Sequence, residues 1–373
     1  MKQFPPFIDQ ALEQARRAVG LTEPNPRVGC VIVSADGQRV LGAGHTQAVG
    51  QAHAEIMALR AAREAGHDVR GATAYVTLEP CSHHGRTSPC CDALIAAGIK
   101  KVVASIADPN PLVSGQGFER LRAAGIEVEV GPGAAESREL NLGFFSRMIR
   151  KTPWVRMKIA ASLDGKTALD NGTSQWITSD AARTDGHAWR ARASAVLTGI
   201  GTLLADNPRL DVRRVDTPRQ PHLVVVDSRL ETPLDAALFV AGRRLYIYAA
   251  VRNDEKKAAL ETRGATVIYL PGKAPKTQGK VDLAAMLRDL ARLEINELHV
   301  EAGHKLNGSL IRDGLVDEFL VYLAPKMVGS GLPMASFGPF DELSQAMQLA
   351  FISSDFVAPD LRVIARVQGR DQF

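Results

Sequence analysis

Two hydrophobic patterns alternate along residues 1–150. In one, apolar residues recur every three to four positions, as at Ile8, Leu12 and Val19, which is typical of an amphipathic helix over residues 7–19. In the other, short and nearly continuous apolar runs indicate buried strands. These patterns predict helices over 54–62, 89–98, 118–124 and 136–150, and strands over 28–33, 40–44, 72–78, 101–106 and 126–130. Strands that alternate with helices indicate an α/β domain whose sheet is covered on both faces.

The pattern starts afresh after residues 151–153. It predicts strands over 154–160, 195–198, 222–227, 245–248, 266–269 and 297–300, a helix over 305–313, and late strands over 318–323 and 361–367. We expect the late strands to complete the sheet, with an antiparallel arrangement at one edge. A chain of 373 residues is too long for one typical hydrophobic core. We therefore predict two domains, residues 1–150 and 151–373.

Composition narrows the class of protein. Hydrophobic residues make up 45% of the chain and charged residues 23%, as in ordinary globular proteins. The formal net charge of +4 is too small to indicate nucleic-acid binding, but it suits anionic small substrates. No apolar run approaches the roughly 18 residues of a membrane-spanning helix. Three of the four cysteines are clustered, which favours metal binding in a reducing compartment, and we expect a cytoplasmic protein.

His53, Cys81 and Cys90 are candidate ligands of a zinc ion. One imidazole and two thiolates leave the fourth position of a tetrahedral site open, and such a site lowers the pKa of bound water to about 7. Glu55 lies two residues after His53, at the start of a predicted helix. A carboxylate that is not a ligand can move protons there. Together these residues predict hydrolytic deamination, with Glu55 as the catalytic acid and base.

Two alternatives for the same residues are a closed, structural zinc site and buried cysteines that bind no metal. A closed site needs a fourth ligand, for which Cys91, His83 and His84 are the candidates. Cys91 adjoins Cys90, so both thiolates would reach one ion only through a strained turn. We therefore favour the open, catalytic site.

The segments around these residues resemble the cytidine-deaminase superfamily. Eight residues separate Cys81 from Cys90, more than the two of the common zinc-deaminase signature. This longer loop, together with residues 25–29 upstream, is similar to the pyrimidine deaminase of riboflavin biosynthesis, and residues 79–87 are a specific match to that family. The resemblance extends over nearly the whole chain, to the bifunctional deaminase/reductase family of that pathway. It implies a cytidine-deaminase-like α/β/α domain, a dihydrofolate-reductase-like α/β domain, one zinc ion per chain and NADPH.

Residues 300–309 follow a predicted strand and open a predicted helix. Glycines and free amides at such a turn bind phosphate, but a plain strand–helix turn fits equally well, and the full dinucleotide fingerprint is absent. Residues 157–165, 174–178 and 201–208 resemble the riboflavin-pathway reductase. The resemblance implies NADP contacts at Ala160, Trp176, Thr202, Asp206, Ser228, Gly303, His304, Lys305, Leu306, Asn307, Gly308 and Ser309. It implies substrate contacts at Ser174, Arg190, Leu210, Arg213 and Glu301.

Charged side chains suggest where phosphate binds. The guanidinium forks of Arg190 and Arg213 suit a phosphate, although a solvated helix face and a surface loop would also explain them. In the deaminase half, we hypothesise that His83, Arg86 and Thr87 hold the ribose phosphate of the substrate. A solvated loop is the alternative there.

The family resemblance implies two consecutive reactions. The first deaminates 2,5-diamino-6-ribosylamino-4(3H)-pyrimidinone 5′-phosphate. The second reduces the ribosyl group with NADPH to give 5-amino-6-ribitylaminouracil 5′-phosphate, and the enzyme is expected to be a homodimer or a higher homo-oligomer. One rival is a nucleoside or transfer-RNA deaminase with an accessory domain, which gives the second half no role. The other is a non-enzymatic zinc module that binds nucleic acid, for which an aromatic content of 5% is low.

Overall fold

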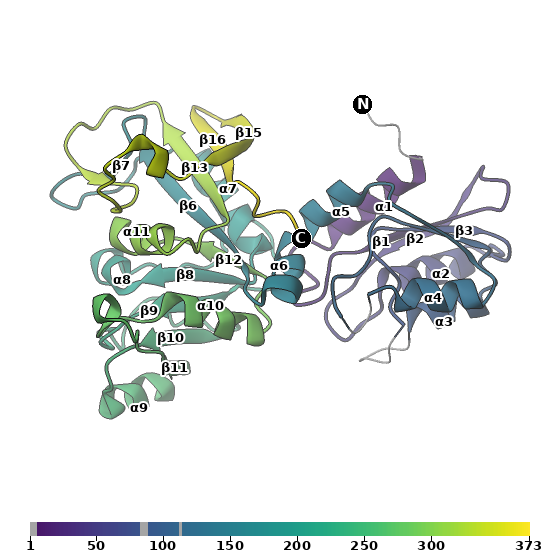
Figure 1. The fold of residues 1–373 in the computed structure, drawn as a ribbon, viewed down its shortest axis with the longest axis horizontal. Helices are drawn as coiled ribbons and strands as arrows, with labels where there is room; N and C mark the ends of the chain where they lie inside the picture. The colour runs from purple at the N-terminus through teal and green to yellow at the C-terminus, as the bar shows by residue number, and fades with distance from the viewer. Residues whose placement is uncertain (1–5, 83–88, 112–113) are drawn as a thin grey trace. The chain divides into compact units, whose positions relative to one another are not determined.

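The computed structural model describes residues 6–82, 89–111 and 114–373. The chain divides into two compact units, Met1–Arg150 and Lys151–Phe373, at the position where the hydrophobic pattern starts afresh. Each unit has its own sheet and its own core (Figure 1).

The first unit is built on a five-stranded sheet in the order β2-β1-β3-β4-β5. Its strands are β1 (Gly29–Val33), β2 (Val40–His45), β3 (Thr73–Val76), β4 (Lys101–Ala104) and β5 (Glu127–Val130). β1 pairs antiparallel with β2 and β3, whereas β3, β4 and β5 are parallel. All five strands were predicted from the apolar runs, and the observed bounds differ by a few residues.

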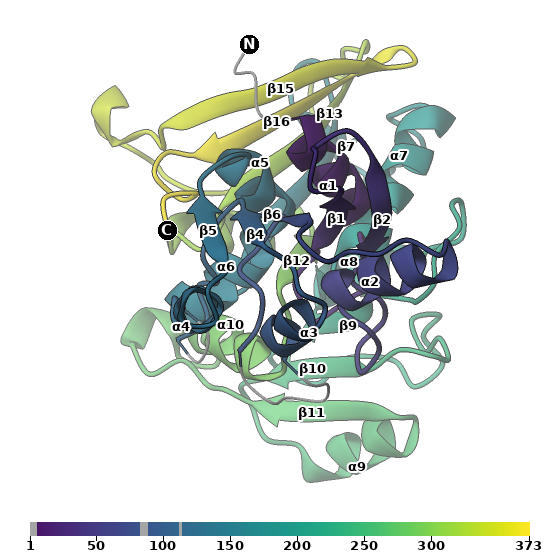
Figure 2. The same cartoon turned by 90° about the vertical axis from the view of Figure 1, so that its right-hand side faces the viewer.

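Helices cover both faces of this sheet (Figures 1 and 2). They are α1 (Pro6–Arg17), α2 (Ala54–Glu64), α3 (Cys90–Ala96), α4 (Gln116–Ala123), α5 (Ala134–Leu140) and α6 (Leu142–Arg150). Helix α1 packs its buried residues Ile8 and Ala11 against Val31 and Val33. On the other face, α2 lies so close to β2 that a Cβ on Gly42 would approach the Ala58 carbonyl oxygen to 2.2 Å. This close approach fixes α2, whose first turn carries the predicted deaminase residues.

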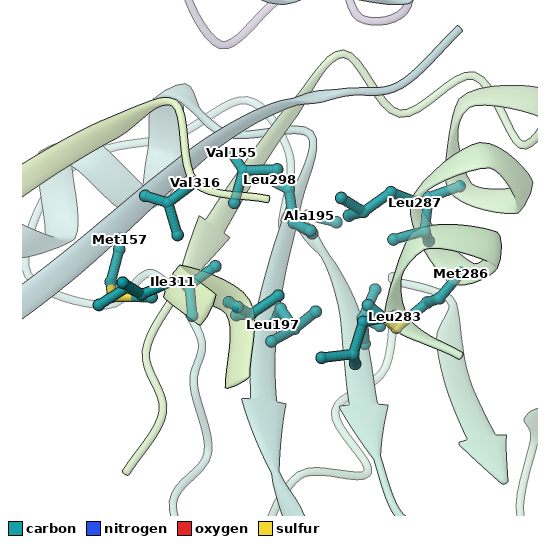
Figure 3. Packing of buried hydrophobic residues seen from close by; sticks show 14 of the residues in the cluster. Val155, Met157, Ala195, Leu197, Leu283, Met286, Leu287, Leu298, Ile311 and Val316 are labelled. Carbon is teal, nitrogen blue, oxygen red and sulfur yellow. The ribbon is translucent and has the colours of Figure 1, made fainter. Parts of the chain in front are cut away.

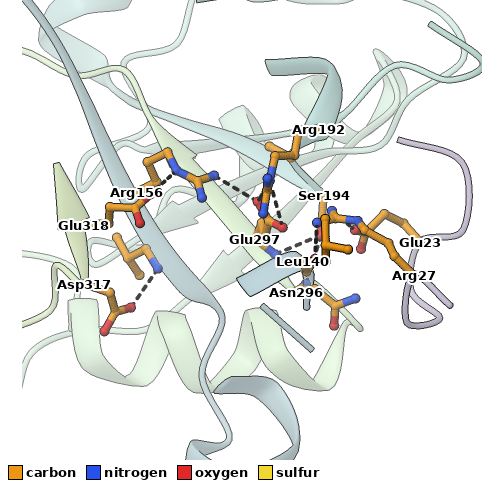
Figure 4. Close-up of polar contacts among 12 residues, drawn as sticks. Glu23, Arg27, Leu140, Arg156, Arg192, Ser194, Asn296, Glu297, Asp317 and Glu318 are labelled. Carbon is orange, nitrogen blue, oxygen red and sulfur yellow. Dashed lines mark hydrogen bonds and ion pairs between the residues drawn. The ribbon is translucent and has the colours of Figure 1, made fainter. Parts of the chain in front are cut away.

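The single helix predicted over residues 136–150 is wrong, because the structure has two helices that meet at Asn141. The Asn141 side chain accepts a hydrogen bond from the Arg27 backbone N–H at 2.7 Å and donates to the Arg27 and Ser137 carbonyls at 3.0 and 3.1 Å. Arg27 in turn pairs with Glu23 and donates to the Leu140 carbonyl (Figure 4). These long-range contacts favour a break that the local charge pattern did not reveal.

The second unit contains a nine-stranded sheet in the order β11-β10-β9-β8-β12-β6-β13-β16-β15. Its strands are β6 (Trp154–Ser162), β8 (Ala195–Gly199), β9 (His222–Val226), β10 (Leu245–Ala249), β11 (Ala265–Tyr269), β12 (Glu297–Val300), β13 (Glu318–Ala324), β15 (Leu349–Val357) and β16 (Asp360–Val367). The strands from β11 to β13 are parallel, and β16 and β15 add antiparallel pairs at one edge, as predicted. β15 itself was missed, since a bulge between Phe351 and Ser353 interrupts its alternation. The short pair β7 (Lys166–Ala168) and β14 (Leu332–Pro333) was also missed.

Helices pack on both faces of this parallel sheet as well. They are α7 (Asp180–Arg192), α8 (Ile200–Asp206), α9 (Asp254–Thr262), α10 (Leu283–Arg292) and α11 (His304–Arg312). Figure 3 shows one core, in which Leu283, Met286 and Leu287 of α10 and Ile311 of α11 pack against residues such as Leu197 of the sheet. The opposite face buries Leu260 of α9 in a second cluster.

Buried ion pairs lie near the amino ends of the central strands (Figure 4). Arg156 of β6 contacts Glu297 at 2.9 Å and Glu318 at 2.5 Å, and all three side chains are 2% exposed. Arg192 reaches Glu297 and Arg366 reaches Glu318. A buried charge is tolerated only when it is paired in this way, so the network constrains the register of neighbouring strands. The ion-pair network therefore lies at the opposite end of these strands from their carboxyl ends.

Candidate functional sites

The three predicted zinc ligands come from three different elements of the first unit. His53 is the N-cap of α2, Cys81 follows β3, and Cys90 is the first residue of α3. Their ligand atoms all lie within 4.8 Å of one another. His53 Nδ1 is 3.6 Å from Cys81 Sγ and 3.4 Å from Cys90 Sγ.

This geometry fits a tetrahedral zinc ion. Zn–S and Zn–N bonds of the usual lengths, at a tetrahedral angle, separate a sulfur from a nitrogen by about 3.6 Å. The two observed nitrogen–sulfur distances match that value. Two thiols and an imidazole are also the donor set that zinc favours over harder cations. The residues present therefore fit the metal without rearrangement.

Cys91, a candidate fourth ligand, faces away from this group. Its thiol donates to the Pro80 carbonyl at 3.2 Å and to the Gly117 carbonyl at 3.5 Å, and its burial raises its pKa to about 12. Within the described part of the chain, no fourth histidine, cysteine or carboxylate joins the group. His83 and His84 lie outside the described residues, as do Arg86 and Thr87, so the predicted phosphate contacts of that loop stay predictions.

Glu55 lies beside the ligands in the first turn of α2 and is only 4% exposed. Burial disfavours the carboxylate, and with the nearby Cys81 it raises the pKa of Glu55 to about 7. A carboxyl group whose pKa lies close to neutrality can both accept and donate a proton.

Glu79 anchors the segment that carries Cys81, and the sequence analysis did not single it out for this role. Its carboxylate accepts four backbone N–H groups, those of Asp108 and Gly115 at 3.1 and 2.9 Å and those of Gly117 and Phe118 at 2.9 and 3.4 Å. Three of these amides belong to the beginning of α4, where helical N–H groups have no intrahelical partner. Glu79 thus ties the strand end before Cys81 to α4.

In the second unit, a cavity of about 2120 Å³ opens at the carboxyl ends of β6, β8, β9 and β12. This is the edge where open parallel sheets bind ligands. A single small molecule typically occupies roughly 300–1,000 Å³, so the cavity has room for a cofactor and a substrate together. Predicted contacts that line it are Ala160, Ser174, Trp176, Arg190, Thr202, Asp206, Leu210, Arg213, Ser228, Glu301, Gly303, His304, Lys305, Leu306, Asn307 and Ser309.

Gly308 is the one predicted cofactor contact that does not line this cavity. It is buried, and a Cβ at this position would lie 1.8 Å from the Ser336 carbonyl oxygen. The position therefore needs glycine for the close approach of the chain around Ser336 to α11. Next to it, His304 Nδ1 lies 2.7 Å from Ser336 Oγ, which steadies the turn before the helix.

Glu301 is the centre of a cluster of charged groups on the cavity wall. Arg190 donates to its two oxygens at 2.5 and 3.0 Å, and Lys158 Nζ lies 3.8 Å away. Burial opposes ionisation of Glu301, but these cations hold its pKa well below its usual range. The Arg190 fork is therefore engaged by Glu301, and the predicted substrate contact at Arg190 stays a prediction.

Two further cationic side chains, Lys158 and Arg213, also line the cavity. Lys158, which the sequence analysis did not single out, lines the cavity, and burial outweighs the attraction of Glu301 and lowers its pKa. Its position in the middle of an apolar strand gave no signal of this role. Arg213 pairs with Asp211 at 2.5 Å but stays 51% exposed, so of the two predicted arginines it is the more accessible to a phosphate.

An open His/Cys/Cys zinc site in one unit and a large cavity at the carboxyl ends of a parallel sheet in the other define a two-site α/β enzyme. The family model of the cytidine and deoxycytidylate deaminase zinc-binding region matches residues 1–106, and that of the RibD C-terminal domain matches residues 153–361. The chain belongs to the RibD family of riboflavin-biosynthesis proteins. The predicted fold class, family and bifunctional character are thereby confirmed, whereas a deaminase with a merely accessory second domain is not.

Individual relatives agree with this assignment over the full length. The riboflavin biosynthesis protein RibD of Escherichia coli is 42% identical over 369 residues, 95% of this chain and 97% of the relative. That of Aquifex aeolicus is 42% identical over 332 residues, 89% of this chain and 90% of the relative. The solved structure of Acinetobacter baumannii RibD has a TM-score of 0.85 at 38% identity and covers 97% of this chain and 98% of its own. The deaminase/reductase of Thermotoga maritima has a TM-score of 0.84 at 34% identity, with the same coverage.

The protein is accordingly a zinc-dependent deaminase and an NADPH-dependent reductase of riboflavin biosynthesis. Its substrate is a small pyrimidine compound. No helix in the part of the chain that the structure describes is long and apolar enough to cross a membrane.

Proposed function

We propose that residues 1–150 deaminate 2,5-diamino-6-ribosylamino-4(3H)-pyrimidinone 5′-phosphate and that residues 151–373 reduce the ribosyl group of the product. The observation that carries this division is the convergence of His53, Cys81 and Cys90 beside Glu55 within the first unit. The second unit holds the cavity large enough for a dinucleotide and a substrate.

In the deaminase unit, His53, Cys81 and Cys90 would hold zinc, and a bound zinc ion would supply an activated water molecule. Glu55 accepts the proton of the attacking water, delivers it to the ring nitrogen of the pyrimidine and then assists the departure of ammonia. Its burial keeps bulk water away from these transfers, and its raised pKa lets one group serve as base and then as acid. His83, Arg86 and Thr87 are proposed to hold the substrate phosphate.

In the reductase unit, NADPH supplies the hydride when it is bound. The exposed Trp176 and the turn from Gly303 to Asn307 line the cavity. These residues are proposed to contact the cofactor, and Glu301 with its cations is proposed to contact the substrate. Arg190 fixes the orientation of the Glu301 carboxylate, which stays ionised and accepts hydrogen bonds from the substrate. Lys158, next to Glu301, is placed to donate a proton or a hydrogen bond to a substrate oxygen.

We further propose a homodimer that forms through the edge strand β15. Phe351 and Phe356 of this strand are 82% and 79% exposed, and Ile352 is 45% exposed. An apolar edge strand with unpaired backbone groups is a strong site for association. Light scattering of the intact protein and of Phe351→Glu tests the dimer: the variant should be monomeric.

The proposed location of the protein is the cytoplasm, where thiol groups stay reduced.

The decisive experiment for the two activities uses the diaminopyrimidine phosphate as substrate, with and without NADPH, and identifies the products by mass. Without NADPH, only the deaminated ribosyl compound should form. With NADPH, the reduced ribityl compound should replace it. Unchanged substrate in both reactions would refute the proposed deaminase, and failure of NADPH to alter the product would refute the proposed reductase.

A further inference from the structure

The cavity of the second unit extends along the sheet beyond the proposed reaction centre. Glu301 follows β12, whereas Ser228 and Arg229 follow β9, two strands away in the sheet order. Adjacent strands are about 4.8 Å apart, so these strand ends are separated by roughly 10 Å. The turn before α11 and Thr202 of α8 lie between them, since a Cβ on Gly303 would be 3.5 Å from Thr202 Oγ1. A cofactor with its nicotinamide near Glu301 and its pyrophosphate at this turn would place its adenosine at the end of β9.

A hairpin-like loop closes this end of the cavity. Pro271 and Val281 form an isolated β-bridge, and the Gly272 N–H donates to the Lys280 carbonyl at 2.8 Å. The Val281 N–H donates to Ser228 Oγ at 3.3 Å, which ties the loop to the end of β9. The loop therefore brings Lys273 and Lys280 to the same end of the cavity as Arg229.

Three cationic side chains line this end of the cavity. Arg229, Lys273 and Lys280 are exposed cavity-lining residues, and none of them forms an ion pair within the described residues. In many NAD-binding sites an acidic residue after a strand binds the ribose 2′-hydroxyl. Here the acid after β9 is Asp227, which is 0% exposed and accepts hydrogen bonds from Glu231 and Thr232. It is therefore not available to a ribose.

We propose that Arg229, Lys273 and Lys280 bind the 2′-phosphate of the adenosine ribose and thereby select NADPH over NADH. The proposal rests on the cofactor site proposed above. It adds the residues that bind the 2′-phosphate, the one group by which NADPH differs from NADH. A phosphate monoester carries a charge of about −1.5 to −2 at neutral pH and three acceptor oxygens, which matches a cluster of three cations. Glu231, also exposed on the cavity wall, would repel that phosphate unless the cations outweigh it.

The test is calorimetric binding of two nucleotide probes to the full-length protein. Adenosine 2′-monophosphate carries the proposed recognition group, and adenosine 5′-monophosphate carries the same base and charge without it. In the triple variant Arg229→Gln, Lys273→Gln, Lys280→Gln, affinity for the 2′-monophosphate should fall by about tenfold to a hundredfold, the range for loss of charged hydrogen bonds. Affinity for the 5′-monophosphate should change little.

Kinetics supply a second, independent comparison. In the triple variant the KM for NADPH should rise by a similar factor, while kcat and the KM for NADH stay near their original values. Lys256→Gln is the matched control, because Lys256 lies in the first turn of α9 of the same unit and does not line the cavity. Equal affinity of original and triple variant for the 2′-monophosphate, or equal weakening of both probes, would overturn the proposal. Absence of NADPH binding to the original protein would instead overturn the cofactor site itself, and this inference with it.

Discussion

Two buried carboxylates, Glu55 and Glu301, show how the surroundings of one residue type decide its role. Burial raises the pKa of Glu55 to about 7, so this group can exchange a proton near neutrality. Glu301 is also buried, yet Arg190 and Lys158 hold its pKa well below the usual range, so it remains a fixed negative charge. Environments that push such pKa values apart support the proposed roles of Glu55 as an acid–base group and of Glu301 as a fixed charge.

Glu55→Gln keeps the size of the side chain but removes its ability to move protons. Because Glu55 is not a ligand, the variant should retain zinc, measured by elemental analysis. Deamination should fall by roughly a hundred- to ten-thousand-fold, the usual contribution of a general acid–base group. Reduction of pre-deaminated substrate serves as the control and should be unchanged. Near-normal deamination would show that another group moves the proton.

Cys91 and Cys90 are adjacent in sequence but face different partners. In Cys91→Ser the hydroxyl group can donate to the Pro80 and Gly117 carbonyls as the thiol does, so zinc should stay at about one ion per chain. In the matched variant Cys90→Ser, one thiolate ligand is lost and zinc should drop far below that ratio. A loss of zinc in Cys91→Ser as large as in Cys90→Ser would refute the ligand assignment.

At the scale of elements, Glu79 links the end of β3 to the start of α4. In Glu79→Gln, one carboxylate oxygen becomes an amide donor that faces backbone N–H groups. The variant should lose about 2–3 kcal/mol of unfolding free energy, measured by denaturant titration, and bind zinc more weakly. Glu127→Gln is the control, because Glu127 is 66% exposed in its pair with Lys101 and should cost about 0–1 kcal/mol. Equal losses in the two variants would argue against the anchoring role.

Strand β12 carries His299, which is 0% exposed. Burial lowers its pKa to about 3, so the folded state stays unprotonated where the unfolded chain, with an ordinary pKa near 6.5, already binds a proton. Stability should therefore fall as the pH falls from about 6.5 toward 3. In His299→Leu this dependence should become shallower, by on the order of 1–3 kcal/mol at pH 4. It should not vanish, because burial also lowers the pKa of His187 and His222 to about 4. An unchanged pH profile of unfolding would contradict this account.

At the scale of the whole molecule, the two compact units should separate the two activities. A fragment of residues 1–150 should bind zinc and deaminate, and one of residues 151–373 should bind NADPH and reduce the deaminated compound. In the full-length chain, Arg190→Lys keeps a cation beside Glu301 but loses the two-point contact. Reduction should slow and the deaminated ribosyl intermediate should accumulate, as followed by mass. If this variant lost deamination and kept reduction, the activities would be assigned to the wrong units.

Much of the fold follows from local patterns. Apolar runs and three-to-four spacing identified the strands and helices around the zinc site, because a buried strand or amphipathic helix must show its period in the sequence. The hydrophobic pattern did not predict those features of the fold that depend on contacts with distant residues or on strand pairing. The break at Asn141 depends on Arg27, more than a hundred residues earlier, and the bulge in β15 removed the alternation that identifies a strand.

The sequence by itself predicted His53, Cys81 and Cys90 as zinc ligands, Glu55 as their acid–base partner, and the family, because the residue types and spacings of these motifs are typical of zinc deaminases. The tertiary structure alone decided which groups meet across elements. In the folded chain, the Cys91 thiol contacts the Pro80 carbonyl, and Arg190 pairs with Glu301, with Lys158 beside them. Arg229, Lys273 and Lys280 line one end of the cavity. These side chains lie far apart in the chain, and their charge states follow from burial and from neighbours that only folding supplies.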